Sequence, residues 1–137
     1  MHGDELAGYP SMLNLIDHLI TAYNDSGNAD YAKAQNLING SELWINPLAN
    51  PDGTYRTTNN DVNSSIRGNA EVIDLNRNYP APNGTLHPDG ELYQFETTTF
   101  MDLANEFHFV LAANFHGGEE VFNYPWDFTF DRPVDNE

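Results

Sequence analysis

The first part of the chain mixes apolar and polar residues with the period of an α-helix. Apolar side chains recur at helical spacing from residue 12 to residue 23; they are Met12, Leu13, Ile16, Leu19, Ile20 and Tyr23. This pattern predicts an amphipathic helix that begins near Pro10, because proline is tolerated in a first helical turn. Residues 24–28 have turn chemistry and should end this helix. A shorter helix is expected over residues 31–38, closed by Asn39-Gly40.

Other apolar runs lack the helical period and predict strands. Residues 43–48 form the first run, which contains Pro47 near its end. Residues 109–115 form the second, and their nearly continuous apolar character suits a central strand covered on both faces. Residues 121–124 are expected to form a further short strand. Between these runs, residues 95–107 carry apolar residues four apart and predict another helix.

The connections also carry signals. Asn50-Pro51-Asp52-Gly53 has proline at its second place and glycine at its fourth, which fits a tight type I turn. Residues 54–69 are polar and without a period, so they predict a long loop of the kind that is usually functional or disordered. Helices that alternate with strands give an α/β fold class. A length of 137 residues suits one domain.

Charge and composition exclude several classes of partner. Five Lys and Arg residues against 21 Asp and Glu residues give a net charge of −16, and phosphate binding needs a basic surface. We therefore expect neither a nucleic-acid partner nor an anionic membrane partner. No apolar run approaches the ~20 residues of a membrane-spanning helix. The chain has no cysteine, which excludes disulfides and thiolate metal sites.

Two histidines and a glutamate are candidate metal ligands. His2 and Glu5 stand three residues apart, so a turn or helix start would place both side chains on one side. His116 follows the predicted strand at residues 109–115, and strand ends in open α/β sheets are where sites collect. Two imidazoles and one carboxylate form the three-ligand set that a catalytic zinc uses. The alternative is a solvated histidine at the chain start and a hydrogen-bonded histidine in the core.

A second group of candidates can bind a carboxylate. Arg77 presents a planar fork that pairs with carboxylates through two hydrogen bonds, and Asn76 adds an amide donor beside it. Arg67 lies nine residues before Asn76 and is a third candidate. The alternatives are a structural ion pair for Arg77, which is easily available among so many acids, and a surface position for Arg67.

Taken together, these segments resemble the zinc metallocarboxypeptidases of the carboxypeptidase A/B superfamily. Four motifs occur in that family's order: His2-Gly3-Asp4-Glu5, Asn50-Pro51-Asp52-Gly53, Asp74-Leu75-Asn76-Arg77-Asn78 and His116-Gly117-Gly118. The spacing from Arg67 to Asn76, and Asn123-Tyr124-Pro125 after the last motif, are similar to the carboxypeptidase D/E/N-like branch. The resemblance runs over nearly the whole chain.

The resemblance implies a role for each candidate. His2, Glu5 and His116 would hold one Zn²⁺, which is the ligand set known from carboxypeptidase A. Asn76 and Arg77 would bind the free C-terminal carboxylate of a peptide. Arg67 would polarise the carbonyl that is cleaved and stabilise the oxyanion. The implied activity is removal of C-terminal residues from peptides by metal-activated water.

The resemblance also implies a fold, and the chain departs from the family in length. We expect residues 1–137 to be a partial catalytic domain: part of a three-layer α/β/α sandwich with a mixed central sheet, truncated at both ends. The leading strands and the C-terminal half, which carries the family's general-base glutamate and mobile tyrosine, would be absent. Glu119 and Glu120 follow His116 closely, but the family does not place its base there.

Two functions fit these residues. The first is a zinc carboxypeptidase whose residues 1–137 alone are inactive or weakly active. The second is a non-catalytic module that binds zinc and peptide C-termini. A sheet that lacks strands would expose edges and apolar faces, so self-association through them is expected. A secreted or periplasmic location is implied by the resemblance only.

Overall fold

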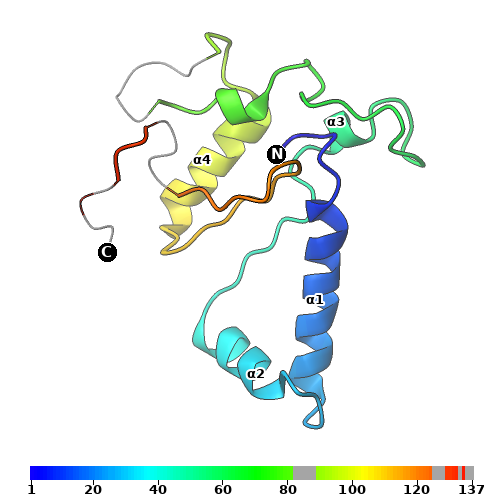
Figure 1. Ribbon diagram of the computed structural model, residues 1–137, viewed down its shortest axis with the longest axis vertical. Coiled ribbons are helices and arrows are strands. Elements are labelled where there is room, and N and C mark those ends of the chain that lie inside the picture. The colour runs from blue at the N-terminus through cyan, green and yellow to red at the C-terminus, as the bar shows by residue number, and fades with distance from the viewer. Residues whose placement is uncertain (82–88, 125–128, 133, 135–137) are drawn as a thin grey trace.

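The computed structural model describes residues 1–81, 89–124, 129–132 and 134. Figure 1 shows its helices and connecting segments. They are α1 (Gly8–Asn24), α2 (Tyr31–Gly40), α3 (Pro51–Thr54), the 3₁₀ turn η1 (Leu75–Arg77) and α4 (Phe95–Phe107). Within these described ranges, no helix has the length and apolar character needed to cross a bilayer.

The helices predicted from apolar periodicity are confirmed. Helix α1 begins two residues before Pro10, which therefore sits in the first turn, where a helix has no partner for its N–H. Helix α2 extends the predicted range to Gly40, and α4 has the predicted bounds. The turn at Asn50 continues into a single helical turn, α3, in which the Asn50 side chain accepts a hydrogen bond from the Gly53 N–H.

Helices α1 and α2 form a hairpin that extends away from the start of the chain (Figure 1). Ala22 and Ala34 are the buried residues of the two helices. The side chain of Gln35 donates to the Tyr23 carbonyl at 2.9 Å, and the Tyr23 hydroxyl donates to Asn39 at 3.1 Å. These contacts hold the hairpin together, and they lie far along the chain from the candidate ligands.

The expected α/β sandwich with a mixed central sheet is wrong for the described residues, which form helices and no strand. The runs at residues 43–48 and 109–115, and the short run at 121–124, are irregular. A strand is stable only when neighbours take its backbone hydrogen bonds. Among the described residues, no backbone-to-backbone hydrogen bond reaches either of the two longer runs. A local apolar pattern predicts a strand without showing that a pairing partner exists.

The two irregular runs instead line a cavity of about 780 Å³. Trp44 of the first run packs on Phe107, with ring centroids 4.4 Å apart, and lies 6.1 Å from Phe109 of the second. Farther along the second run, Val110 and Leu111 are 103% and 87% exposed. The apolar side chains that would fill a sheet core are therefore largely open to solvent.

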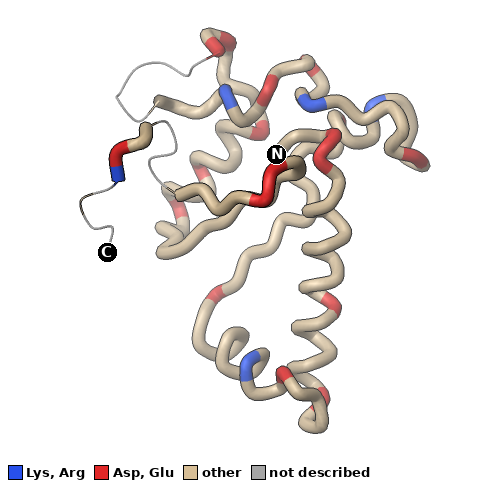
Figure 2. Tube along the Cα trace, viewed as in Figure 1, with Lys and Arg blue, Asp and Glu red and all other residues tan. Residues whose placement is uncertain are grey.

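The buried part outside the hairpin is mostly polar, and it includes His2 of the candidate site. Its buried residues are Gly3, Gly53 and Gly68 together with His2, Asn50, Thr54, Asn69, Leu75, Asn78 and Thr97. Figure 1 shows the chain start beside α3 and beside the end of the run at residues 109–115. Figure 2 shows acidic residues spread over the described chain and basic residues at a few scattered positions. The site is thus assembled from connections that hydrogen bonds hold together.

Candidate metal site

The start of the chain is held in a tight turn against two other segments. The Glu5 N–H donates to the His2 carbonyl at 3.3 Å, which turns both side chains to one side. The Gly3 N–H donates to the Arg67 carbonyl at 3.2 Å. A Cβ at Gly3 would lie 2.5 Å from the Ile66 carbonyl oxygen, so only glycine allows this approach.

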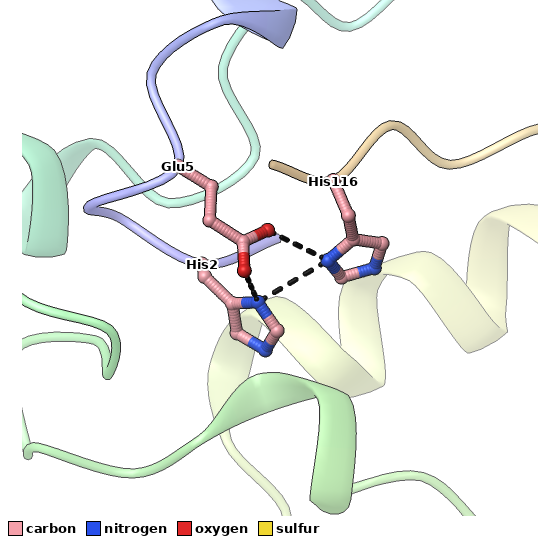
Figure 3. Close-up of side chains that lie close together, drawn as sticks. All are labelled: His2, Glu5 and His116. Carbon is pink, nitrogen blue, oxygen red and sulfur yellow. Dashed lines mark hydrogen bonds and ion pairs between the residues drawn. The ribbon is translucent and has the colours of Figure 1, made fainter. Parts of the chain in front are cut away.

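This turn brings His2 and Glu5 to His116, as Figure 3 shows. Nδ1 of His2 lies 2.7 Å from Oε1 of Glu5, and Nδ1 of His116 lies 2.8 Å from Oε2 of Glu5. The two Nδ1 atoms are 3.2 Å apart. Across the described part of the chain, these residues are the single group of three or more His, Cys, Asp or Glu side chains that could hold one metal ion.

The protonation of His2 suits a metal ligand. Nε2 of His2 lies 3.0 Å from Oδ1 of Asp74, and a carboxylate can only accept, so Nε2 carries the proton. In a neutral imidazole the other nitrogen, Nδ1, then has a free lone pair that faces Glu5 and His116. A carboxylate that holds a histidine in this way is common behind metal-ligating histidines.

The contacts of His2 Nδ1 also fit a bound cation. This nitrogen has three close neighbours: Oε1 of Glu5, Nδ1 of His116 and Nη1 of Arg67 at 3.2 Å. A single ring nitrogen offers one donor or one acceptor, so it cannot satisfy all three. A cation among the lone pairs of Glu5 and the two histidines resolves this conflict. The donor set, two imidazoles and a carboxylate, is the one that zinc accepts.

Glu5 is held in its charged form. Without a bound metal, burial would raise the pKa of Glu5, but the hydrogen bond from the Gly117 N–H and the close His2 and His116 rings outweigh burial and lower the pKa to about 2. The Gly117 N–H donates to Oε2 at 3.0 Å. Glu5 is thus ready to bind a cation throughout the physiological pH range.

His116 comes from the irregular run that ends beside the chain start. Its side chain is 34% exposed, whereas the His2 side chain is 3% exposed. The two rings lie 4.7 Å apart at their centroids and are tilted by 55°. One ligand is therefore held inside the protein, and another faces an open side from which a substrate could approach.

Arg67 lies beside two of the three candidate ligands, His2 and Glu5. Its Nε donates to Oδ2 of Asp74 at 2.8 Å, and its Nη1 lies 3.5 Å from Oε1 of Glu5. Burial would raise the pKa of Asp74, but the Arg67 hydrogen bond and the Asn76 N–H outweigh burial and lower the pKa. Asp74 therefore stays charged and orients both His2 and Arg67.

Asn76 and Arg77 lie on η1 and are exposed. The Asn76 N–H donates to Oδ1 of Asp74 at 2.9 Å, so η1 is joined to the carboxylate that holds His2. Arg77 Nη1 donates to the Asn76 carbonyl at 3.0 Å. His2, Arg67 and Asn76 thus share the Asp74 carboxylate as a partner, whereas the side chain of Arg77 donates to the Asn76 carbonyl instead.

Reasoning from the sequence missed the role of Asp74 and the Gly117 N–H. Asp74 is the first residue of the Asp-Leu-Asn-Arg-Asn motif, which was a signal that it belongs to the site. Gly117 directly follows His116 in the sequence, and this adjacency was the signal that its N–H lies near the Glu5 carboxylate. In the Asn123-Tyr124-Pro125 motif that follows His116, Pro125 lies outside the described residues.

Sequence comparisons find several carboxypeptidases among the relatives of this chain. The carboxypeptidase D of Mus musculus is 35% identical over 128 residues, which cover 93% of this chain and 9% of that protein. The carboxypeptidase M of Mus musculus is 36% identical over 93% of this chain and 27% of that protein. The carboxypeptidase N catalytic chain of Homo sapiens is 32% identical over 98% of this chain and 33% of that protein.

The chain therefore spans a third or less of these relatives. No solved structure gives a significant match. The family model for zinc carboxypeptidase matches residues 1–137. On the strength of that match, the chain belongs to the zinc carboxypeptidase family.

Proposed function

We propose that residues 1–137 provide the zinc-binding and carboxylate-binding part of a metallocarboxypeptidase that removes C-terminal residues from peptides. The observation that carries the proposal is the convergence of His2, Glu5 and His116, whose donor atoms all lie within 4.8 Å of one another. Family membership supports the enzyme class and implies zinc. Zinc held by these three residues would supply Lewis-acid chemistry, which polarises a carbonyl and activates water.

Arg67 is the residue proposed to stabilise developing negative charge. Its guanidinium lies beside Glu5 and is 46% exposed at the side chain, so it can reach a substrate that enters the open side of the ligand group. Removal of such a donor typically costs about 10²–10³ in rate. Asp74 would keep Arg67 oriented through the hydrogen bond to its Nε.

Asn76 and Arg77 are proposed to bind the free carboxylate at the end of a peptide. Arg77 is exposed, and its guanidinium can present two parallel N–H donors to a carboxylate. Asn76 adds an amide donor from the same 3₁₀ turn. This arrangement would select peptides by their terminus, and an amidated C-terminus would lose the charged partner.

None of residues 1–137 matches the family's general-base glutamate, so this part of the chain has no residue assigned to that role by resemblance. A general base usually contributes about 10²–10⁴-fold to the rate. We therefore expect residues 1–137 alone to bind zinc and to hydrolyse peptides weakly or not at all.

A zinc titration of the purified chain tests the metal assignment. We expect one equivalent of Zn²⁺ by competition with a chromophoric chelator, and loss of binding in His116→Ala. A wild-type chain that takes up no zinc in a non-chelating buffer would overturn the assignment.

A second candidate function is a non-catalytic module that binds zinc and peptide C-termini, because no residue among 1–137 matches the family's general-base glutamate by resemblance. Matched peptides with a free and an amidated C-terminus distinguish the two functions. Binding of the free form without cleavage, in a protein that contains all of its chain, supports the module. Release of the terminal residue supports the enzyme.

We also propose two properties that the ligand group does not determine. Exposed apolar side chains on the run at residues 109–115 favour self-association. A secreted or periplasmic location follows from the resemblance to the carboxypeptidases, and fractionation of the native host would test it.

A further inference from the structure

The Asn50 side chain joins three segments of the chain at one buried point. Asn50 is 2% exposed. Its Nδ2 donates to the Gly68 carbonyl at 3.0 Å and to the Met1 carbonyl at 3.3 Å. Its Oδ1 accepts from the Gly53 N–H at 2.9 Å. The one amide group thus uses both donors and its acceptor within the protein.

The two carbonyls that Asn50 binds stand next to residues of the site. Met1 precedes His2, the most buried of the proposed ligands, and Gly68 follows Arg67. Asn50 itself contacts neither the ligand group nor Arg67 through any of these hydrogen bonds. It therefore acts on both residues through the backbone that carries them.

Neighbouring contacts make the same junction tight. The Thr54 hydroxyl donates to the Gly3 carbonyl at 2.8 Å, and the Ile66 N–H donates to the Gly53 carbonyl at 2.9 Å. A Cβ at Gly53 would overlap the Gly68 carbonyl oxygen. Helix α3 is therefore the element against which the chain start and the Arg67 segment are both positioned.

We propose that Asn50 is a positioning residue that sets where His2 lies relative to Arg67. The inference rests on the proposed function, in which His2 holds zinc and Arg67 faces the substrate. An amide is required because only an amide of this size offers two donors and one acceptor. An aspartate would place a carboxylate against two carbonyl oxygens, and an alanine would take this partner from the Met1 and Gly68 carbonyls and the Gly53 N–H.

Asn78 provides a matched control for Asn50. Asn78 is 0% exposed, its Nδ2 donates to Asp89 at 2.9 Å and to the Leu92 carbonyl at 3.2 Å, and its Oδ1 accepts from the Gln94 N–H at 2.8 Å. Both asparagines therefore use two donors and one acceptor in equally buried places, and they differ in that one donor of Asn78 goes to a carboxylate. None of these three bonds of Asn78 reaches the chain start or the Arg67 segment.

The experiment measures Zn²⁺ affinity by chelator competition and the visible spectrum of the Co²⁺-substituted chain. In Asn50→Ala we expect zinc affinity to fall about 10–100-fold, as it does when the supporting residues of metal ligands are removed. We also expect the Co²⁺ spectrum to change, because the ligand geometry changes. Asn78→Ala should lose comparable stability, while its zinc affinity stays within about threefold and its Co²⁺ spectrum is unchanged.

Hydrogen exchange measured without metal keeps the inference separate from the proposed function. Asn50→Asp, which keeps the size of the side chain, should increase exchange at the Gly3 amide about tenfold or more. Asn78→Ala should leave that amide as it is in the wild type. If the wild type binds no zinc, the proposed function fails. The exchange rate of the Gly3 amide still tests whether Asn50 positions the chain start.

Two results would overturn the role of Asn50. One is an Asn50→Ala chain with lower stability but wild-type zinc affinity and an unchanged Co²⁺ spectrum. The other is an Asn50→Asp chain whose Gly3 amide exchanges no faster than that of the wild type. Either result would make Asn50 a residue of general stability only.

Discussion

Asp74 fixes which nitrogen of His2 faces Glu5 and His116. Its Oδ1 accepts from Nε2 of His2 at 3.0 Å, while its Oδ2 accepts from Nε of Arg67 at 2.8 Å. One carboxylate thus orients both an imidazole that can bind a metal and a guanidinium that can face a substrate. Because Asp74 contacts both side chains, it is the first residue that we would substitute.

Asp74→Asn should lower zinc affinity about 10–100-fold, because the supporting carboxylate makes the imidazole more basic and holds its ring. The substitution keeps an acceptor oxygen but removes the charge. Chelator competition measures the effect, and Asp17→Asn on the exposed surface of α1 is the control. Equal affinities in the two variants would show that Asp74 does not support the site.

Arg77→Lys should weaken binding of a peptide with a free C-terminus about tenfold. A lysine keeps the charge but cannot form two parallel hydrogen bonds with a carboxylate. Isothermal titration with a non-cleaved peptide measures the change, and the amidated peptide should bind both proteins equally weakly. Arg56→Lys, in which the original side chain donates to the Ala70 carbonyl, is the control. An effect as large in Arg56→Lys would count against a specific role for Arg77.

The metal-free protein should lose stability in acid through Glu5. The pKa of Glu5 is about 2 in the folded chain against an ordinary value of 4.5. A lowered folded pKa stabilises the protein above the unfolded value, and this contribution is lost as the pH falls from 4.5 towards 2. We expect the loss in the free energy of unfolding to be about 1–2 kcal/mol, because solvent weakens the interactions of Glu5.

Urea unfolding at several pH values measures this contribution. The decline in stability between the two pKa values should be shallower in Glu5→Gln than in the wild type. Glu42→Gln, at an exposed position, should leave the decline unchanged. Parallel pH curves for wild type and Glu5→Gln would contradict the assignment.

Tyr79 should titrate late in alkali. Burial, and then the charge of Glu96, raise the pKa of Tyr79 to about 12. A raised folded pKa stabilises the protein below the ordinary value of 10, and this contribution is lost as the pH rises from 10 to 12. Absorbance at the tyrosinate band measures the titration. In Tyr79→Phe, the step at the highest pH in the titration curve should be absent. An unchanged highest step in that variant would assign the late titration to another tyrosine.

The purified chain should self-associate through the run at residues 109–115. Val110 and Leu111 are almost fully exposed and have no charged neighbour within the run to oppose association. Light scattering should show a smaller species when both are changed to lysine. Leu92→Lys, at an 85% exposed position elsewhere, is the control. A wild-type monomer with a cooperative thermal transition would contradict this prediction.

The sequence predicted the helices well because their signals are local. Apolar spacing was enough to find α4 at residues 95–107, and Asn39-Gly40 marked the end of α2. The strand predictions at residues 43–48 and 109–115 failed because strand formation depends on partners elsewhere in space. An apolar run carries no information about whether those partners are present.

The candidate site shows the same division. The motifs pointed to His2, Glu5 and His116, and the structure places them together. The motifs did not indicate that Asp74 would contact His2, because 72 positions separate the two in sequence. Asn50 was interpreted as a turn residue, which is correct, but its bonds to Met1 and Gly68 depend on how three segments meet.

The shared carboxylate of Asp74 has a thermodynamic consequence. A peptide that drew Arg67 away from Asp74 would change the charge balance of the carboxylate that holds His2, so the proposed peptide binding and zinc binding would be linked. Linkage is reciprocal: any factor by which zinc changes the affinity for a peptide is the factor by which that peptide changes the affinity for zinc. Metal retention by this protein would then depend on how much substrate is present.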